Sequence, residues 1–254
     1  MVKGLDTFKD YFKDYISSYL LIGGTACDIQ FNNAGLNFRA TKDLDIILIV
    51  EAQTPEFVNH FWEFIKLGQY QIKQRSEGER LFYRFTKPKQ DYYPEQIELF
   101  SRNPDLDLSS DATITPMPID DYASSLSAIL MDAEFYHFTI SNSEVIDDIH
   151  IASVPSLIAL KAAAYLNLKQ RKEAGESIDN DDIKKHKNDI VRLTAILTDE
   201  SITDTPQIIT ENIKSILDDF LDDPPDIKVI SKAMNIHVVS LADLIDQIKQ
   251  TFNI

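Results

Sequence analysis

Two aspartates, Asp43 and Asp45, open an apolar run that ends at Val50. Alternate residues of a β-strand project from the same face, so a strand here places both carboxylates side by side. Adjacent anions repel each other unless a cation or hydrogen bonds compensate them. Hard divalent cations such as Mg²⁺, or Mn²⁺, are held by carboxylate oxygens together with substrate phosphates. The pair therefore predicts a divalent-cation site, the alternative being a turn, a helix cap or a solvated face.

A pair of glycines, Gly23 and Gly24, follows the apolar stretch Leu20 to Ile22 and precedes Thr25. Glycine allows a tight turn and lets the backbone approach a ligand closely. If Thr25 caps a helix that runs to about Phe31, the free N–H groups at its start suit a triphosphate. A plain strand-to-helix turn explains the same residues. The glycines therefore predict nucleotide binding only in combination with the aspartates.

The composition narrows the classes of partner. The chain carries 41 acidic and 25 basic residues and a formal net charge of −16. Affinity for nucleic acid comes largely from lysine and arginine, so we expect no broad DNA-binding surface. The composition does not exclude a local basic cleft. One cysteine, Cys27, excludes an intramolecular disulfide and is expected to be a small buried hydrophobe. No run is long enough for a transmembrane helix, so we expect a cytoplasmic protein without a membrane partner.

The chain divides into a mixed half, residues 1–152, and a helical half, residues 153–254. The first half is predicted to contain helices at 5–19 and 25–31 and one starting at Thr54, with strands at 20–22, 43–50, 81–85, 96–100 and 135–140 and a surface loop at 104–121. The second half is predicted to contain helices at 155–171, 181–197, 205–221, 227–234 and 241–251. The acidic string 218–223 is predicted to be a solvated helix end.

Together these segments resemble a known superfamily. A strand, Gly-Gly, a short helix and a strand bearing Asp-x-Asp form the signature of the DNA polymerase β-like nucleotidyltransferases. The run from Arg39 through Thr41 to Asp45 looks most like the AbiEii-type toxin nucleotidyltransferases, which also have a helical C-terminal half. The resemblance covers about the first 100 residues and the start of the helical part. It implies an α+β fold, with a nucleotidyltransferase-type mixed sheet, flanking helices and a helical C-terminal domain.

The resemblance also implies further site residues. The family has a third metal-binding carboxylate on a neighbouring strand, for which Glu98 is the best candidate, the alternative being a solvent-facing residue. Relatives place a lysine where Lys161 stands in an apolar helix, to contact substrate phosphates, whereas a lysine here could also extend to solvent. Asp189 resembles the aspartate that follows this lysine in the toxins, and its alternative is a helix ion pair with Lys185 or Arg192.

The expected activity is transfer of a nucleoside monophosphate from an NTP to a hydroxyl acceptor, with Mg²⁺ or Mn²⁺ at Asp43, Asp45 and Glu98. The resemblance implies a toxin-like role, with tRNA or a protein as acceptor and a cognate antitoxin as partner. One alternative is a transferase acting on a small molecule such as an aminoglycoside, which the acidic composition favours. The other is a catalytically silent module that binds nucleotide or protein.

Overall fold

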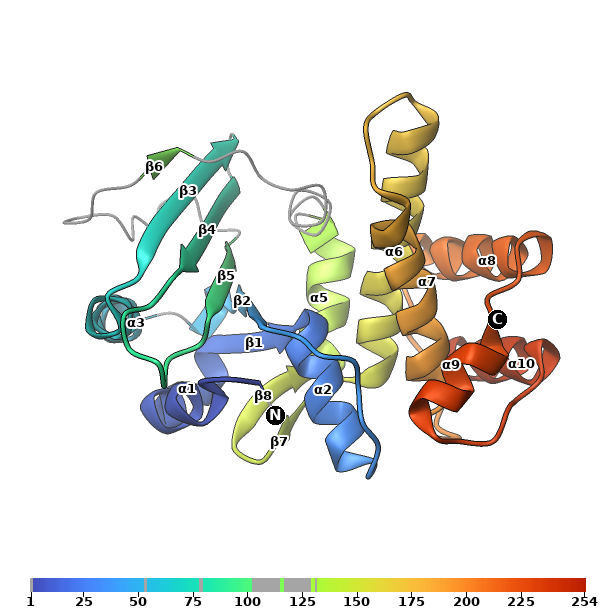
Figure 1. Ribbon diagram of the computed structural model, residues 1–254, viewed down its shortest axis with the longest axis horizontal. Coiled ribbons are helices and arrows are strands. Elements are labelled where there is room, and N and C mark those ends of the chain that lie inside the picture. The colour runs from blue at the N-terminus through green and yellow to red at the C-terminus, as the bar shows by residue number, and fades with distance from the viewer. Residues whose placement is uncertain (1, 53, 78–79, 102–114, 117–128, 131) are drawn as a thin grey trace. The chain divides into compact units, whose positions relative to one another are not determined.

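The computed structural model describes the chain except residues 1, 53, 78–79, 102–114, 117–128 and 131 (Figure 1). It divides into two compact units. As far as these ranges are described, the first unit comprises Met1–Asn33, Phe38–Ile119 and Ser143–Ala152. The second comprises Ala34–Asn37, Asp120–Asn142 and Ser153–Ile254. The chain passes from the first unit to the second between residues 152 and 153, and residues 34–37 and the described part of 120–142 also group with the second unit.

The first unit is built on one mixed sheet. Within the described residues its strand order is β6-β3-β4-β5-β2-β1-β8-β7 (Figure 1). The pairs β2–β5, β1–β8 and β3–β6 are parallel and the other neighbours are antiparallel. The strands are β1 (Tyr19–Ile22), β2 (Asp43–Leu48), β3 (Gln71–Glu77), β4 (Arg80–Thr86), β5 (Gln96–Ser101), β6 (Thr115–Pro116), β7 (Ser143–Ile146) and β8 (Ile149–Ala152). This mixed sheet with flanking helices and a following set of helices confirms the predicted fold class.

An aromatic cluster covers one face of the sheet. Its helices are α1 (Leu5–Phe12) and α3 (Pro55–Gly68), and its fully buried rings are Phe8, Phe12, Tyr19, Phe57, Phe61 and Phe64. The ring of Phe61 lies 5.8 Å from that of Phe85 on β4. Because residues alternate between the faces of a strand, Arg84, the neighbour of Phe85, projects from the opposite face. The sheet therefore has an apolar face against α1 and α3 and a second face on which polar side chains occur.

The second unit is helical. Its helices are α5 (Ala133–Ser141), α6 (Val154–Glu173), α7 (Asn180–Thr194), α8 (Gln207–Asp222), α9 (Ile227–Met234) and α10 (Leu241–Phe252). Their apolar faces are buried, as at Leu157 and Ile158 of α6, Ile190 of α7 and Phe220 of α8. In the described part of the chain, no helix combines the length and hydrophobicity that crossing a bilayer requires.

Some local predictions differ from the structure, and one falls mostly outside the described residues. Residues 135–140 form part of the helix α5 rather than a strand, because the Asp132 carboxylate caps its first turn and because a short apolar run does not distinguish helix from strand. The helix predicted at 5–19 ends at Phe12 and continues as a 3₁₀ segment, Lys13–Ser18, with non-helical Tyr15. The loop predicted at 104–121 lies outside the described residues, apart from β6.

Other predicted features agree with the structure. Cys27 is fully buried in α2 (Gly23–Asn33), as its apolar surroundings predicted. One detail differs: α2 starts at Gly23, so Thr25 lies in its first turn and the prediction that Thr25 is the N-cap is wrong. α3 starts after Thr54, whose side chain accepts a hydrogen bond from the Phe57 amide as an N-cap. Five of the helices in the second unit follow the predicted segments closely, because their apolar residues recur at helical spacing.

Candidate functional site

Acidic and basic side chains form a row across three adjacent strands of the sheet. Asp45 on β2 is the register partner of Glu98 on β5, and Glu98 is the partner of Arg84 on β4. Register partners on adjacent strands project from the same face, so the three side chains share the polar face of the sheet. Asp43 and Gln96, two residues back on β2 and β5, form the next pair on that face. The sheet thereby brings the predicted carboxylates Asp43, Asp45 and Glu98 together on one surface.

Glu98 is buried and held by two neighbours. Its side chain is 3% exposed, and Oε1 lies 2.7 Å from Nη2 of Arg84. Nε of Arg84 also donates to Oε1 over 2.8 Å, and the Gln96 amide donates to it over 2.9 Å. The alternative of a solvent-facing Glu98 is therefore wrong. The guanidinium of Arg84, itself largely buried, provides the counter-charge that a carboxylate in such a position needs.

The first residue of α2 lies against this row of charged side chains. Gly23 adopts φ +65°, and a Cβ added there would lie 1.8 Å from Oδ2 of Asp45. Only glycine leaves room for that carboxylate at the start of the helix. A Cβ on Gly24 would lie 2.4 Å from Oγ1 of Thr41. Both glycines are thus required by close approach of the segment 41–45, and the negative charge of Asp45 lies where the helix dipole is positive.

Thr25 ties this helix to the strand that carries the aspartates. Its hydroxyl donates a 2.6 Å hydrogen bond to the main-chain carbonyl of Asp43, and its side chain is fully buried. Thr25 therefore lies inside the first turn of α2 and holds β2 against it. Asp43 is half-buried, whereas Asp45 is 3% exposed. The outer aspartate remains accessible at the end of β2 while the inner one lies against Gly23.

Asp43 and Asp45 have the chemistry that a divalent cation requires. Two carboxylates on one face of a strand fit Mg²⁺, which is bound in proteins by one or two carboxylates and completes its octahedron with waters and phosphate oxygens. Among the residues that the structure describes, no three His, Cys, Asp or Glu side chains converge as a ready-made metal-binding group. Asp43 and Asp45 are residues that could hold a cation, in which case the remaining ligands would come from substrate and water.

The other two predicted residues, Lys161 on α6 and Asp189 on α7, meet within the helical unit. Nζ of Lys161 lies 3.2 Å from Oδ2 of Asp189, and Nη1 of Arg192 lies 3.1 Å from Oδ1 of the same carboxylate. The side chains of Lys161 and Asp189 are 5% and 0% exposed. Lys161 therefore contacts an anion of its own chain and does not extend to solvent. Asp189 makes the predicted pair with Arg192 in addition.

A second buried network in the helical unit was not predicted. Asp219 of α8 accepts hydrogen bonds from Tyr165 and Lys169 of α6, and lies 3.5 Å from Nζ of the buried Lys187 of α7. The pKa of Asp219 is lowered: burial raises it, but the hydrogen bonds from Lys169 and Tyr165 and the lysine charges outweigh burial. The expectation that 218–223 is wholly a solvated helix end is wrong at Asp219, because this residue faces α6 and α7.

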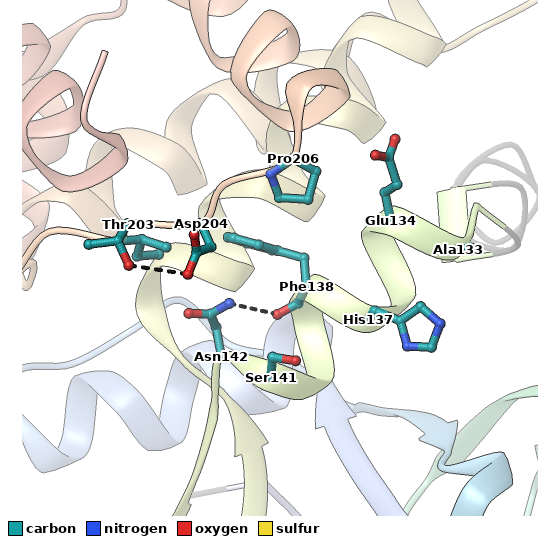
Figure 2. Close-up of a pocket in the computed structure, with 10 residues that line it drawn as sticks. Ala133, Glu134, His137, Phe138, Ser141, Asn142, Thr203, Asp204 and Pro206 are labelled. Atoms are coloured by element: carbon teal, nitrogen blue, oxygen red, sulfur yellow. Dashed lines mark hydrogen bonds between the residues drawn. The ribbon is translucent and has the colours of Figure 1, made fainter.

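The helical unit also contains a cavity of about 530 Å³ between α5 and the segment before α8 (Figure 2). Figure 2 shows Phe138 extending from α5 toward Thr203 and Asp204, while Glu134 and His137 project from the other end of the lining. The Asn142 amide donates to the Phe138 carbonyl at the end of α5. The predicted site residues do not line this cavity.

Sequence reasoning missed Arg84 and Gln96, which hold Glu98. A signal was present for Arg84, a charge between Tyr83 and Phe85 in a strand of large apolar residues. The argument applied to Asp43 and Asp45, that a charge on a buried strand needs a partner, applies equally to Arg84. What the pattern did not specify is the register that places Arg84 opposite Glu98.

Comparisons with known proteins found similarity to solved structures. No family model matches the chain, and no curated protein matches its sequence. The crystal structure of an antigenic nucleotidyltransferase-like protein from Paracoccidioides brasiliensis is similar, with a TM-score of 0.42 and 13% sequence identity. The similarity covers 95% of this chain and 97% of that protein.

Proposed function

We propose that this chain is a nucleotidyltransferase that moves a nucleoside monophosphate from an NTP to a hydroxyl acceptor. In this reaction the acceptor oxygen bonds to the α-phosphorus, the bond from the α-phosphorus to the bridging oxygen breaks, and pyrophosphate leaves. Asp43 and Asp45 would hold Mg²⁺ or Mn²⁺, which supplies positive charge to the phosphate oxygens when bound.

The observation that carries the proposal is the meeting of carboxylates and a glycine-led helix at one point of the sheet. Asp45 lies in register with Glu98 and directly against Gly23, the first residue of α2. A helix start offers unpaired N–H groups to phosphate, and the carboxylates offer oxygen ligands to its cation. Both halves of a cation–triphosphate complex therefore have matching groups on this surface.

The remaining predicted residues have more specific proposed roles. Gly23, Gly24 and the backbone of Thr25 would receive the triphosphate. Glu98 would act beside the cation and help to activate the acceptor hydroxyl. Contributions of Lys161 to phosphate neutralisation and of Asp189 to catalysis stay predictions, which the conservative variants Lys161→Met and Asp189→Asn test.

The acceptor and the biological role are more specific proposals than the reaction itself. The resemblance to AbiEii-type toxins supports tRNA or a protein as the acceptor, a toxin-like role and a cognate antitoxin. The net charge of −16 supports the alternative of a cationic small molecule, such as an aminoglycoside, because an acidic surface attracts cations and repels tRNA. Offering all three acceptors in one assay distinguishes these possibilities.

One observation favours a second candidate, a nucleotide-binding module without transferase activity. Oε1 of Glu98 is engaged by Arg84, so this carboxylate differs from a metal ligand that awaits its cation. Such a module would bind NTP without releasing pyrophosphate.

The test is transfer from each of four NTPs labelled at the α-phosphate, with Mg²⁺, to total tRNA, to the protein itself and to an aminoglycoside. Asp43→Asn and Asp45→Asn should abolish both labelling and pyrophosphate release, whereas Asp10→Asn, at an exposed position of α1, should leave both unchanged. Full activity in Asp45→Asn would show that the metal assignment is wrong. NTP binding without pyrophosphate release from the unaltered protein would favour the silent module.

A further inference from the structure

The cavity between α5 and the segment before α8 has the size of a small-molecule site. Its volume is about 530 Å³, and pockets that bind small molecules measure about 300–1,000 Å³. Its lining belongs to the helical unit, and none of the residues that the proposed transferase function uses lines it. The cavity is therefore a candidate ligand site that the proposed reaction leaves unassigned.

Hydrogen bonds to neighbouring helices hold both walls of this cavity in place. At the end of α5, the main-chain carbonyl of Asn142 accepts a 2.8 Å hydrogen bond from the Ser156 hydroxyl of α6. On the opposite wall, the Ile202 amide donates over 2.8 Å to the Thr251 carbonyl of α10. A site whose walls are already ordered binds its ligand without the entropic cost of assembling them.

One side of the cavity presents hydrogen-bond acceptors. Nδ2 of Asn142 donates to the Phe138 carbonyl over 2.9 Å, which fixes the direction of the side-chain amide. Figure 2 shows the other end of this amide, Oδ1, on the side lined by Thr203 and Asp204. The Thr203 hydroxyl donates over 3.4 Å to Oδ2 of Asp204. A carboxylate and an amide oxygen thus line the same side of the cavity, and both can accept a hydrogen bond from a ligand.

The charges of the lining favour an organic cation. Among the described residues that line the cavity are two carboxylates, Asp204 and Glu134, and no lysine or arginine, so an anion has no strong partner there. A metal ion is a poor fit, because in the described parts of the chain no three His, Cys, Asp or Glu side chains converge to bind one. Phe138, Ile202 and Pro206 add apolar surface to the lining, which suits a ligand with a hydrocarbon body.

We propose that this cavity binds the protonated amine of a small organic molecule. The ammonium group donates hydrogen bonds to the carboxylate of Asp204 and to Oδ1 of Asn142, and the charge of Asp204 strengthens its bond. The hydrocarbon body of the ligand packs against Phe138, Ile202 and Pro206. This inference goes beyond nucleotidyl transfer and does not depend on it.

The test compares three probes that share a phenyl group and an ethylene linker and differ in the group at the end: phenethylamine, phenethyl alcohol and hydrocinnamate. Each is titrated into the isotope-labelled full chain, and the backbone amide signals of residues 141–142 and 202–204 are followed by NMR. Phenethylamine should shift these signals at millimolar concentration. It should bind about tenfold more tightly than the alcohol, because a hydrogen bond between two charged groups contributes more than one from a neutral donor, and hydrocinnamate should bind more weakly still.

Three variants with exposed side chains locate the ammonium group. Asp204→Asn should weaken the binding of phenethylamine about tenfold, because the negative charge is lost. Asp199→Asn is the matched control, since Asp199 lies on the same segment but does not line the cavity. Glu134→Gln, at the other end of the lining, should weaken binding less than Asp204→Asn does. All three positions are exposed, so we expect the variants to fold as the unaltered chain does.

Several outcomes would overturn this assignment. If the alcohol or hydrocinnamate bound as tightly as phenethylamine, the cavity would not recognise an ammonium group. An unchanged affinity in Asp204→Asn, or an equal loss in Asp199→Asn or Glu134→Gln, would show that Asp204 is not its partner. Shifts confined to signals outside the cavity, or none at millimolar phenethylamine, would show that the amine does not bind there. None of these measurements depends on transferase activity, so the proposed function stands or fails separately.

Discussion

Replacing Gly23 with alanine tests the contact on which the geometry of the site depends. Gly23 has φ +65°, and its added Cβ would lie 1.8 Å from Oδ2 and 2.7 Å from Cγ of Asp45. The methyl group and the carboxylate cannot both keep their positions. Gly23→Ala should therefore lower the free energy of unfolding and displace the carboxylate of Asp45.

Two contributions set the size of this loss. A left-handed backbone costs a residue with a Cβ about 1–2 kcal/mol. Forcing an extra carbon into a packed position costs about 1–3 kcal/mol more, so the total should be about 2–5 kcal/mol. A domain has a free energy of unfolding of about 5–15 kcal/mol, so the variant should remain folded but be measurably less stable.

The chain offers a control that isolates the backbone contribution. Gly35 has φ +72°, nearly the same as Gly23, and a Cβ added there would have no atom within 4 Å. Gly35→Ala should therefore lower the free energy of unfolding only by the backbone contribution of about 1–2 kcal/mol. Urea denaturation followed by circular dichroism measures both variants, and the difference between them reports the contact with Asp45.

A double variant identifies the atoms responsible. In an Asp45→Ala background the clashing carboxylate is absent, so Gly23→Ala should cost little more there than Gly35→Ala does. An equal loss from Gly23→Ala with and without the Asp45 carboxylate would refute the reasoning. A loss from Gly23→Ala no larger than that from Gly35→Ala would refute it as well.

The two buried ion networks of the helical unit give the remaining predictions. Asp219→Asn should lower the free energy of unfolding by about 1.5–3 kcal/mol, because it weakens the hydrogen bonds that the carboxylate accepts from Tyr165 and Lys169, while Lys187 keeps its closer ion pair with Asp223. Since the pKa of Asp219 in the folded protein lies below its ordinary 3.8, this stabilisation is present above pH 3.8 and disappears as the pH falls below it. Urea denaturation across this range should show the two proteins converging in acid, and a constant difference would contradict the pKa shift. Lys161→Met should lower the free energy of unfolding by about 1.5–3 kcal/mol, because Asp189 loses one of its two cationic partners and keeps Arg192. Lys161→Met/Asp189→Leu should lose less than the sum of the two single variants, and strictly additive losses in calorimetry would show that the pair is not coupled.

Local sequence patterns were sufficient to predict many of the helices and strands. Helices such as α9 follow their predicted range because apolar residues recur at helical spacing within one short segment. β2 follows an apolar run that begins with Asp43, and alternation along it places Asp43 and Asp45 on one face. Such features depend only on neighbours in the chain, so the sequence indicates them directly. Where a run was too short to show a period, as at 135–140, the helix was mistaken for a strand.

The sequence by itself determined the division into a mixed and a helical part, the strand with its paired aspartates and the glycines before α2. Only the tertiary structure decided what these residues meet. The contact of Glu98 with Arg84 depends on the register of β4 and β5, and the burial of Asp219 depends on packing against α6 and α7. Register and packing join residues far apart in the chain, and their energies come from the whole set of contacts, so no local pattern specifies them.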